Sequence, residues 1–172
     1  RLTVPLWDFE GTPRGLQGRD ISGNCSARWV GLTNPETSKW ARFGYFRGDA
    51  WEDTCLVVEG PSDALTAYAA GYGACFVRGA SLADDTVADE LAAGLRGQHV
   101  CIAADTDPAG ERFRDRLAAA LHSRGIPVHL VRVPFPDSDL TDWRERDPGT
   151  FDDALHRAVR DAEVWEPPAE DT

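Results

Sequence analysis

The sequence predicts an α/β fold in which a parallel sheet flanked by helices is preceded by a small β-rich subdomain. The composition is that of an ordinary soluble domain, with 42% hydrophobic and 27% charged residues among 172. After residue 54, apolar runs typical of buried strands alternate with helical patterns; before it, the pattern is that of hairpins. No apolar run reaches the ~18–20 residues of a membrane span, and the start resembles no signal peptide.

Residues 1–52 are predicted to form the β-rich subdomain. Short strands at 2–9 and 15–21 flank a turn that contains glycine and proline, which is the pattern of a β-hairpin. A third strand is expected at 27–32. Residues 34–44 carry a proline and several polar side chains, and we expect a loop there.

Residues 53–146 are predicted to form a second domain, of α/β type. Four apolar runs indicate buried parallel strands, at 55–58, 74–77, 99–104 and 128–133. Helical patterns separate these strands, at 61–70, 84–95 and 108–124. Such alternation predicts a parallel sheet with right-handed crossovers. The remaining residues, 147–172, should form a helix at 151–162 and an acidic, proline-rich tail.

The four cysteines are widely spaced and include no C-x-x-C pair, so a zinc ribbon is not expected. Three of them, Cys55, Cys75 and Cys101, lie in or beside predicted strands, where free cysteine behaves as a small buried hydrophobe. A reducing, cytoplasmic location is therefore expected. The chain starts at Arg1 and has no methionine, and we interpret it as a piece of a longer protein.

The net charge of −11 is unevenly distributed. Residues 1–51 hold seven basic and five acidic residues, whereas the remainder holds 11 basic and 24 acidic ones. A mildly basic front suits a nucleic-acid surface, and a strongly acidic back suits a metal site. An ordinary acidic domain would show the same totals, so charge alone does not decide the function.

Acidic residues follow three of the predicted strands. Glu59 follows the first, Asp105 and Asp107 follow the third, and a further group, at 137, 139 and 142, follows the fourth. Because ligands of open parallel sheets bind beyond the carboxyl ends of the strands, these acids should meet at one edge. Clustered carboxylates repel one another, and a hard divalent cation such as Mg²⁺ is the usual compensation.

Each of these acids alone has a simpler interpretation as a helix cap or turn residue. Asp107 stands before Pro108 and is a credible N-cap, and Asp63 is a credible first-turn acid. The convergence of three acidic groups on one sheet edge favours metal binding over that interpretation. Two metals so held can stabilise the attacking and leaving oxygens of an in-line displacement.

Two motifs resemble the signatures of the Toprim family, which occurs in bacterial-type primases, topoisomerases, recombination-repair proteins and nucleases. They are LVVEG at 56–60 and DTDPAG at 105–110. The extension EGPSDA, which includes Asp63, and the segment PFPDSDLTD at 134–142 are similar to the primase version. This resemblance implies that residues 53–146 are a Toprim catalytic domain, with metal ligation by Glu59, Asp105, Asp107 and one acid of the last segment. The segment has DLTD where the family has a tighter acidic spacing, so Asp137, Asp139 and Asp142 remain alternatives; Asp139 is favoured. Asp63 and Asp142 would support the ligands from outside the metal shell.

The residues before these motifs resemble the basic subdomain that precedes Toprim in bacterial and phage primases. The resemblance lies in LTVPLWDFEGTPRGLQGRDI at 2–21 and NPETSKW at 34–40. It implies that Arg19, Arg28 and Lys39 contact template or nucleotide. Lys39 is the only lysine among 18 basic residues, and a lysine supplies a compact charge that arginine does not mimic.

The resemblance implies the core of a DnaG-like primase that makes RNA primers on single-stranded DNA with Mg²⁺ or Mn²⁺. Nucleoside triphosphates and a replicative helicase would be its partners, and Glu59, Asp105 and Asp107 its catalytic residues. Two alternatives remain: a Toprim nuclease that hydrolyses phosphodiesters, and a non-catalytic module that binds DNA or a partner. Three tyrosines outside any recognisable motif offer no sign of a topoisomerase nucleophile.

Overall fold

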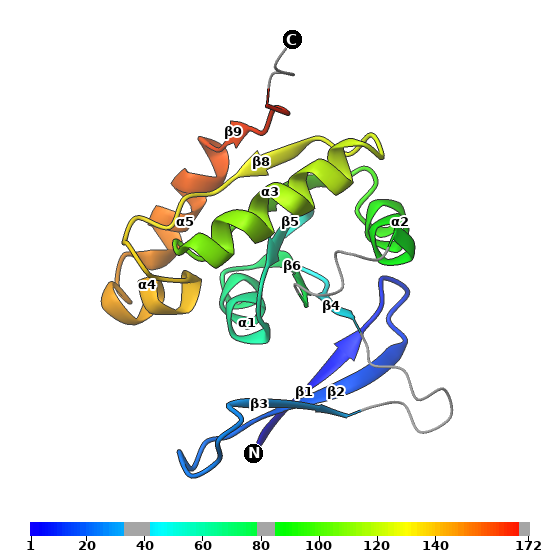
Figure 1. Ribbon diagram of the computed structural model, residues 1–172. Helices are drawn as coiled ribbons and strands as arrows, with labels where there is room; N and C mark the ends of the chain where they lie inside the picture. The colour runs from blue at the N-terminus through cyan, green and yellow to red at the C-terminus, as the bar shows by residue number, and fades with distance from the viewer. Residues whose placement is uncertain (33–41, 79–84, 169–172) are drawn as a thin grey trace.

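The computed structural model describes residues 1–32, 42–78 and 85–168 and confirms the predicted α/β class (Figure 1). One sheet is antiparallel and three-stranded, in the order β1-β2-β3; the other is six-stranded, in the order β4-β6-β5-β7-β8-β9. The strands are β1 (Leu2–Trp7), β2 (Pro13–Arg19), β3 (Trp29–Leu32), β4 (Phe43–Phe46), β5 (Trp51–Val58), β6 (Tyr72–Val77), β7 (His99–Ile102), β8 (Val128–Leu130) and β9 (Glu163–Val164). The helices are α1 (Pro61–Ala69), α2 (Asp85–Gly94), α3 (Pro108–His122), α4 (Leu140–Arg146) and α5 (Phe151–Arg160).

The four central strands of the large sheet, β6, β5, β7 and β8, run parallel, as predicted, and the strands at its two edges, β4 and β9, run antiparallel to their neighbours. β4 precedes the segment predicted to be catalytic and β9 follows it, so residues on both sides of that segment complete its sheet.

The predicted loop at 34–44 is wrong for its last two residues, Phe43 and Gly44, which begin β4. In the structure Gly44 lets the edge strand approach β6, because a Cβ atom at that position would lie 2.5 Å from the ring of Phe76. Residues 34–41 of that prediction lie outside the described part of the chain.

Helices cover both faces of the six-stranded sheet (Figure 1). On one face, apolar residues of α1, α4 and α5 pack against β5, β6 and β7 in one buried cluster. On the other face, α2 and α3 form a second cluster with the same strands, in which Leu91, Leu117 and Leu121 are fully buried. Strands buried on both faces explain the continuous apolar runs in the sequence.

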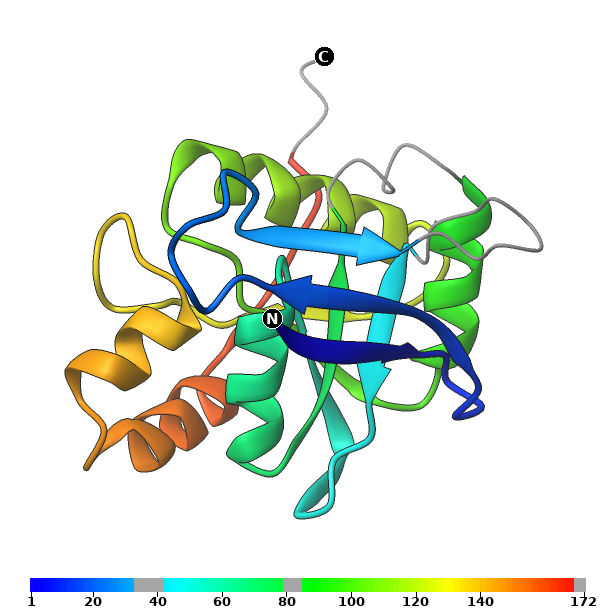
Figure 2. The ribbon, with the colours of Figure 1, turned by 90° about the horizontal axis from the view of Figure 1, so that it is seen from below.

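The three-stranded sheet lies against the β4 side of the large sheet (Figure 2). Leu6 of β1 is buried in the cluster of α1, α4 and α5. At the turn between β1 and β2, the Phe9 ring lies 4.7 Å from the Tyr45 ring, centroid to centroid. It also fills the space beside Gly94 at the end of α2, where a Cβ atom would lie 2.1 Å from the ring. The hairpin tip thus fastens the small sheet to the large one.

Three of the four cysteines, Cys55, Cys75 and Cys101, are buried free thiols, as predicted, and Cys25 is exposed. Among the residues that the structure describes, no helix has the length and apolar character needed to cross a membrane.

Candidate metal centre

The acids predicted to converge lie beyond the carboxyl ends of β5 and β7 and in the segment after β8. Glu59 follows β5 directly, and Asp63 stands in the first turn of α1. Asp105 and Asp107 lie between β7 and α3, and Asp139 immediately precedes α4. The parallel arrangement of β5, β7 and β8 brings these segments to the same edge of the sheet.

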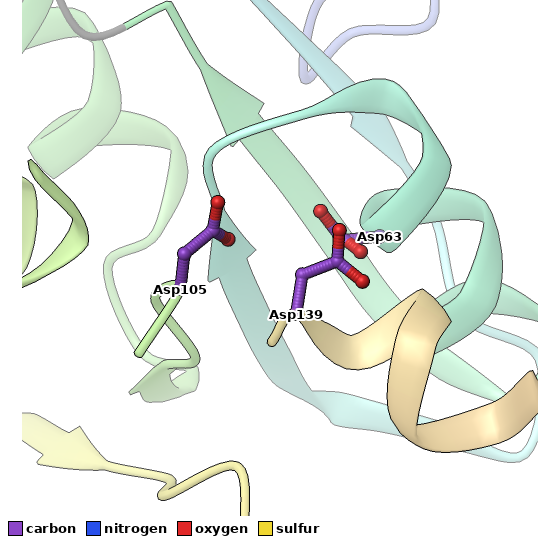
Figure 3. A group of neighbouring side chains, drawn as sticks. All are labelled: Asp63, Asp105 and Asp139. Carbon is purple, nitrogen blue, oxygen red and sulfur yellow. The ribbon is translucent and has the colours of Figure 1, made fainter. Parts of the chain in front are cut away.

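Three carboxylates form the centre of this edge: Asp63, Asp105 and Asp139, here called the aspartate triad (Figure 3). One oxygen of each lies within 4.8 Å of the other two. Oxygens bound to one divalent cation at roughly 2.0–2.6 Å can be at most about 4–5 Å apart. The triad is therefore of the size that a single cation would hold together.

Glu59 lies beside the triad and is held by the backbone of Asp105, whose N–H donates to Glu59 Oε1 at 3.2 Å. Gly110 makes this arrangement possible. A Cβ atom at that position would lie 2.1 Å from the carbonyl oxygen of Asp105 and 2.9 Å from Glu59 Oε1. The glycine of the DTDPAG motif thus allows α3 to begin directly against the acidic loop.

Asp107 and Asp139 both act as N-caps. Asp107 accepts a hydrogen bond of 2.7 Å from the N–H of Gly110 in α3. Asp139 accepts one of 2.7 Å from the N–H of Asp142, and Asp142 Oδ2 accepts in return from the N–H of Asp139 at 3.4 Å, which completes a capping box. Asp139 therefore combines a cap with a place in the triad, whereas Asp107 lies outside it.

Thr106, between the two aspartates of the DTD motif, ties the loop after β7 to the segment that carries Asp139. Its hydroxyl lies 2.6 Å from the carbonyl oxygen of Phe135 and accepts from the N–H of Ser138 at 2.9 Å. The N–H of Thr106 donates to the carbonyl of Ser138 at 3.0 Å. These hydrogen bonds, made by the residues next to Asp105 and Asp139, thus fix the positions of the two aspartates relative to each other.

Asp63 is almost fully buried, with 5% of its surface exposed. Its Oδ1 atom accepts two hydrogen bonds from Thr141, one of 3.1 Å from the backbone N–H and one of 2.7 Å from the hydroxyl. The first turn of α4 therefore binds Asp63 through Thr141, and Asp139 is the N-cap of the same helix.

Burial and mutual repulsion raise the pKa values of three acids at this edge, Glu59, Asp63 and Asp105. Burial raises the pKa of Asp105 to about 7, with a further contribution from four neighbouring carboxylates. Burial also raises the pKa of Asp63 to about 7; the charges of Asp139 and Asp105 add to this rise, and the hydrogen bonds from Thr141 oppose it. The pKa of Glu59 is likewise raised, mainly by burial.

No lysine or arginine neutralises these charges within the part of the chain that the structure describes. None of the ion pairs found there involves Glu59, Asp107, Asp142 or a triad residue. The ligand atoms available are carboxylate oxygens alone. Hard divalent cations prefer such oxygens, whereas softer transition metals prefer nitrogen or sulfur. The residues present therefore fit a site for Mg²⁺ or Mn²⁺.

The remaining acid of the PDSDLTD segment, Asp137, is exposed and adopts a positive φ of 47°. Of the three alternatives in that segment, Asp139 belongs to the triad, Asp142 to its capping box, and Asp137 to a turn.

The basic residues predicted to bind nucleic acid belong to the three-stranded sheet and its connections. Arg19 ends β2, and its guanidinium carbon lies 5.8 Å from the centre of the Trp29 ring. Arg28 is exposed just before β3. Lys39 falls outside the described residues.

The model of the Toprim-like family matches residues 56–146, which is more than half of the chain and includes every acid described above. The chain belongs to the Toprim-like family. The predicted resemblance is thereby confirmed. No curated protein matches this Toprim-like chain.

Solved structures of primases share the fold of this Toprim-like chain. The Aquifex aeolicus primase, in a structure of its zinc-binding and RNA polymerase domains, is 22% identical with a TM-score of 0.74 over 96% of the chain. The RNA polymerase domain of Mycobacterium tuberculosis primase DnaG is 19% identical, with a TM-score of 0.66 over 94%. A chain from a structure of bacteriophage T7 lagging-strand DNA polymerase with primase domains, bound to an RNA/DNA hybrid and dTTP, is 18% identical. Its TM-score is 0.64 over 95% of the present chain and 78% of its own length. The present chain spans 41% of the Aquifex chain and 55% of the Mycobacterium chain.

The prediction from sequence did not include the two threonines that bind the acidic segments together, Thr106 and Thr141. One signal was available: both stand next to or between acids of the motifs. Nothing in the sequence says which distant segment such a hydroxyl contacts, because the partners lie 32 and 78 residues away.

Proposed function

We propose that the chain is the metal-dependent catalytic core of a DnaG-like primase, which synthesises RNA primers on single-stranded DNA as part of a larger replication protein. The observation that carries the proposal is the extent of the structural likeness. It includes the three-stranded sheet as well as the Toprim segment, because it covers 94–96% of the chain in the two bacterial primases. A likeness confined to the Toprim segment would favour a primase no more than a nuclease.

The triad residues Asp63, Asp105 and Asp139 would hold the divalent cation, with Glu59 and Asp107 beside them as further ligands. When bound, Mg²⁺ or Mn²⁺ supplies positive charge that neutralises nucleotide phosphates and stabilises an in-line displacement. The carboxylates present their oxygens to it from three different segments, and the hydrogen bonds described above hold those segments in place.

Glu59 would complete the metal site or, as the alternative, take the proton of the attacking 3′-hydroxyl. Its Oε1 atom accepts from the N–H of Asp105, which leaves Oε2 as the atom that would bind the metal or receive the proton. Burial raises the pKa of Glu59, and a base whose pKa is closer to neutrality is more effective in proton transfer.

The three basic residues of the front segment, Arg19, Arg28 and Lys39, would contact the phosphates of template or nucleotide. The T7 structure supports this part of the proposal, because it contains primase domains in a complex with a DNA polymerase, an RNA/DNA hybrid and dTTP. The lengths of the two bacterial primase chains support the presence of additional modules, such as one that chooses the template and one that binds the helicase.

A primer-synthesis gel tests the proposal. The protein is mixed with single-stranded DNA of mixed sequence, labelled ribonucleotides and Mg²⁺ or Mn²⁺, and a labelled-DNA lane is run beside it. The Asp105→Asn/Asp107→Asn double variant should abolish synthesis. The matched control is Asp152→Asn/Asp153→Asn, which removes two exposed charges from the first turn of α5, away from the site.

A metal-dependent ladder of short products, absent in the first variant and present in the control, is the expected result. Shortened DNA without a ladder would contradict the proposal and establish a nuclease. Neither signal, in a longer protein that carries zinc-binding and helicase modules, would leave a binding module without catalytic activity.

A further inference from the structure

A short chain of hydroxyl groups joins α1 and α4 behind Asp63. The hydroxyl of Thr141 lies 2.7 Å from Asp63 Oδ1 and 3.3 Å from the hydroxyl of Thr66, one turn along α1 from Asp63. Thr66 is buried and Thr141 is half-buried. The chain thus runs from the core toward the triad and ends on a carboxylate.

Ionised Asp63, the form that binds a cation, fixes the direction of this chain. A carboxylate only accepts hydrogen bonds, so the proton between Thr141 and Asp63 belongs to Thr141. The oxygen of Thr141 is then the acceptor for Thr66, whose hydroxyl donates to it. In this order the hydroxyl dipoles all favour the negative charge on Asp63.

The same helix end holds two members of the triad. The N–H groups of the first turn of a helix have no partner within the helix. In α4, the N–H of Thr141 donates to Asp63 Oδ1, and the N–H of Asp142 donates to Asp139. Two like-charged carboxylates are therefore held side by side by adjacent backbone donors of one element.

The two donors of Thr141 occupy one oxygen of Asp63. Within the described residues, the hydrogen bonds to Asp63 all go to Oδ1. No donor from the described part of the chain reaches Oδ2, and Asp63 is a member of the triad with Asp105 and Asp139. The Asp63 side chain cannot rotate away from the triad without breaking both bonds to Thr141.

We propose that Thr141 is a positioning residue for the cation site, which holds Asp63 Oδ1 with two hydrogen bonds so that Oδ2 is presented to the ion. The inference rests on one part of the proposed function, namely that the triad binds a divalent cation. It gives the DLTD segment, whose spacing departs from the family pattern, a role of its own: Thr141 orients a carboxylate supplied by α1.

Titration of the metal-free chain with Mn²⁺ at pH 8, followed by the electron paramagnetic resonance signal of free Mn²⁺, tests the inference without nucleotide or DNA. Thr141→Val removes the hydroxyl and keeps the shape and the backbone N–H. It should weaken Mn²⁺ binding roughly tenfold, as loss of a group that orients a ligand commonly does. Thr141→Ser, which keeps the donor, should restore binding to within about twofold of the wild type, well below that tenfold loss.

Two further variants sharpen the test. Thr66→Val removes the outer hydroxyl and should weaken Mn²⁺ binding less than Thr141→Val does. Thr150→Val is the matched control, because Thr150 precedes α5 and its side chain makes no capping hydrogen bond. It should leave Mn²⁺ binding unchanged. If Thr141→Val does not fold, as judged by its melting temperature without metal, Thr141→Ala replaces it with the same expectation.

Unchanged Mn²⁺ affinity in the folded Thr141 variant would overturn the inference, as would a Thr141→Ser variant as weak as Thr141→Val, or a wild-type chain that binds no Mn²⁺. Failure of the proposed function is a separate outcome. A wild-type chain that makes no primers, but loses Mn²⁺ affinity with Thr141→Val and regains it with Thr141→Ser, would contradict the primase proposal alone.

Discussion

Two nearly buried aspartates, Asp8 and Asp63, lie in regions with opposite electrostatics. Asp8, in the turn between β1 and β2, is 6% exposed; Asp63, at the carboxyl edge of the large sheet, is 5% exposed. Each accepts hydrogen bonds from backbone N–H groups. Burial acts against the charge of both, but hydrogen bonds and the nearby guanidinium of Arg14 lower the pKa of Asp8, whereas the pKa of Asp63 rises to about 7.

The difference lies in the neighbouring charges. The Arg14 side chain pairs with Asp8 Oδ2 at 2.6 Å, so the charge of Asp8 is balanced by a cation of the same hairpin. Asp63 has Asp139 and Asp105 as its charged neighbours and pairs with no cationic side chain among the described residues. We infer that two equally buried acids differ in their roles: Asp8 stabilises a turn, and the charge of Asp63 fits our proposal that a cation binds to the triad.

The largest effect should come from removing a triad charge. Asp105→Asn should reduce primer synthesis at least ~100-fold, since groups that stabilise transition-state charge have effects of this order. Asp8→Asn should leave the synthesis rate per folded molecule unchanged. Rates measured with saturating Mn²⁺ check both variants. Equal losses of synthesis in the two would contradict the claim that the triad, and not Asp8, is needed for catalysis.

Gly110→Ala should be the most destabilising single change at the carboxyl edge. The added Cβ atom would lie 2.1 Å from the carbonyl oxygen of Asp105, and overpacking of this kind costs about 1–3 kcal/mol. Urea denaturation measures the loss. Gly149→Ala is the control, because a Cβ atom there meets nothing within 4 Å.

Neutralising the two compared aspartates should change stability in opposite directions. Without metal, Asp63→Asn should raise the free energy of unfolding by about 1 kcal/mol, because the amide can still accept from Thr141 and repels neither Asp105 nor Asp139. Asp8→Asn should lower it by about 1 kcal/mol, through the weakened contact with Arg14. Destabilisation by Asp63→Asn would show that the triad charges are already compensated.

The pH dependence of stability should reflect the raised pKa values. The pKa values of Asp63 and Asp105 are about 7 in the folded protein, against ~3.9 for an unfolded aspartate, so the folded state binds more protons between about pH 4 and pH 7. The free energy of unfolding of the metal-free protein should therefore fall as the pH rises through this window. Mn²⁺ affinity should rise from pH 6 to pH 8 as the same groups ionise.

Denaturation curves at pH 5 and pH 8, recorded with and without Mn²⁺, check both expectations. The Asp63→Asn/Asp105→Asn variant is the control and should lose most of the difference in stability between the two pH values. A metal-free protein that is more stable at pH 8 than at pH 5 would contradict the assignment of the raised pKa values.

The smallest effect separates the two possible roles of Asp107. Asparagine caps helices as well as aspartate does, so Asp107→Asn should change stability by less than about 0.5 kcal/mol, whereas Asp107→Ala should cost about 1 kcal/mol. Primer synthesis lost in the stable Asp107→Asn variant would support a part in metal binding. Full synthesis in that variant would leave Asp107 as a cap for α3 alone.

Much of the fold could be predicted because its signals are local. Apolar runs placed the four parallel strands, and Pro61 and Pro108 marked the starts of α1 and α3. The convergence of acids was also predictable, since parallel strands bring their carboxyl ends to the same edge. The edge strand β4 was not, because Phe43–Phe46 is short and its glycine serves a close contact with the distant Phe76.

The detail of the site depends on contacts that no local pattern encodes. Asp63 was predicted to support the site from outside, yet the structure gathers it with Asp105 and Asp139. The turn of α1 directs Asp63 inward, and Thr141, 78 residues later, holds it there. α4 was not predicted at all, and it is the element that carries Asp139 and anchors Asp63.

A crystal of the chain grown with MnCl₂, with diffraction measured at a wavelength where manganese scatters anomalously, would show whether the triad binds a cation. We expect an anomalous peak within bonding distance of Asp63, Asp105 and Asp139, with Asp63 contributing Oδ2 while Oδ1 stays bonded to Thr141. A peak coordinated elsewhere on the chain, or none at the triad at saturating Mn²⁺, would contradict this expectation.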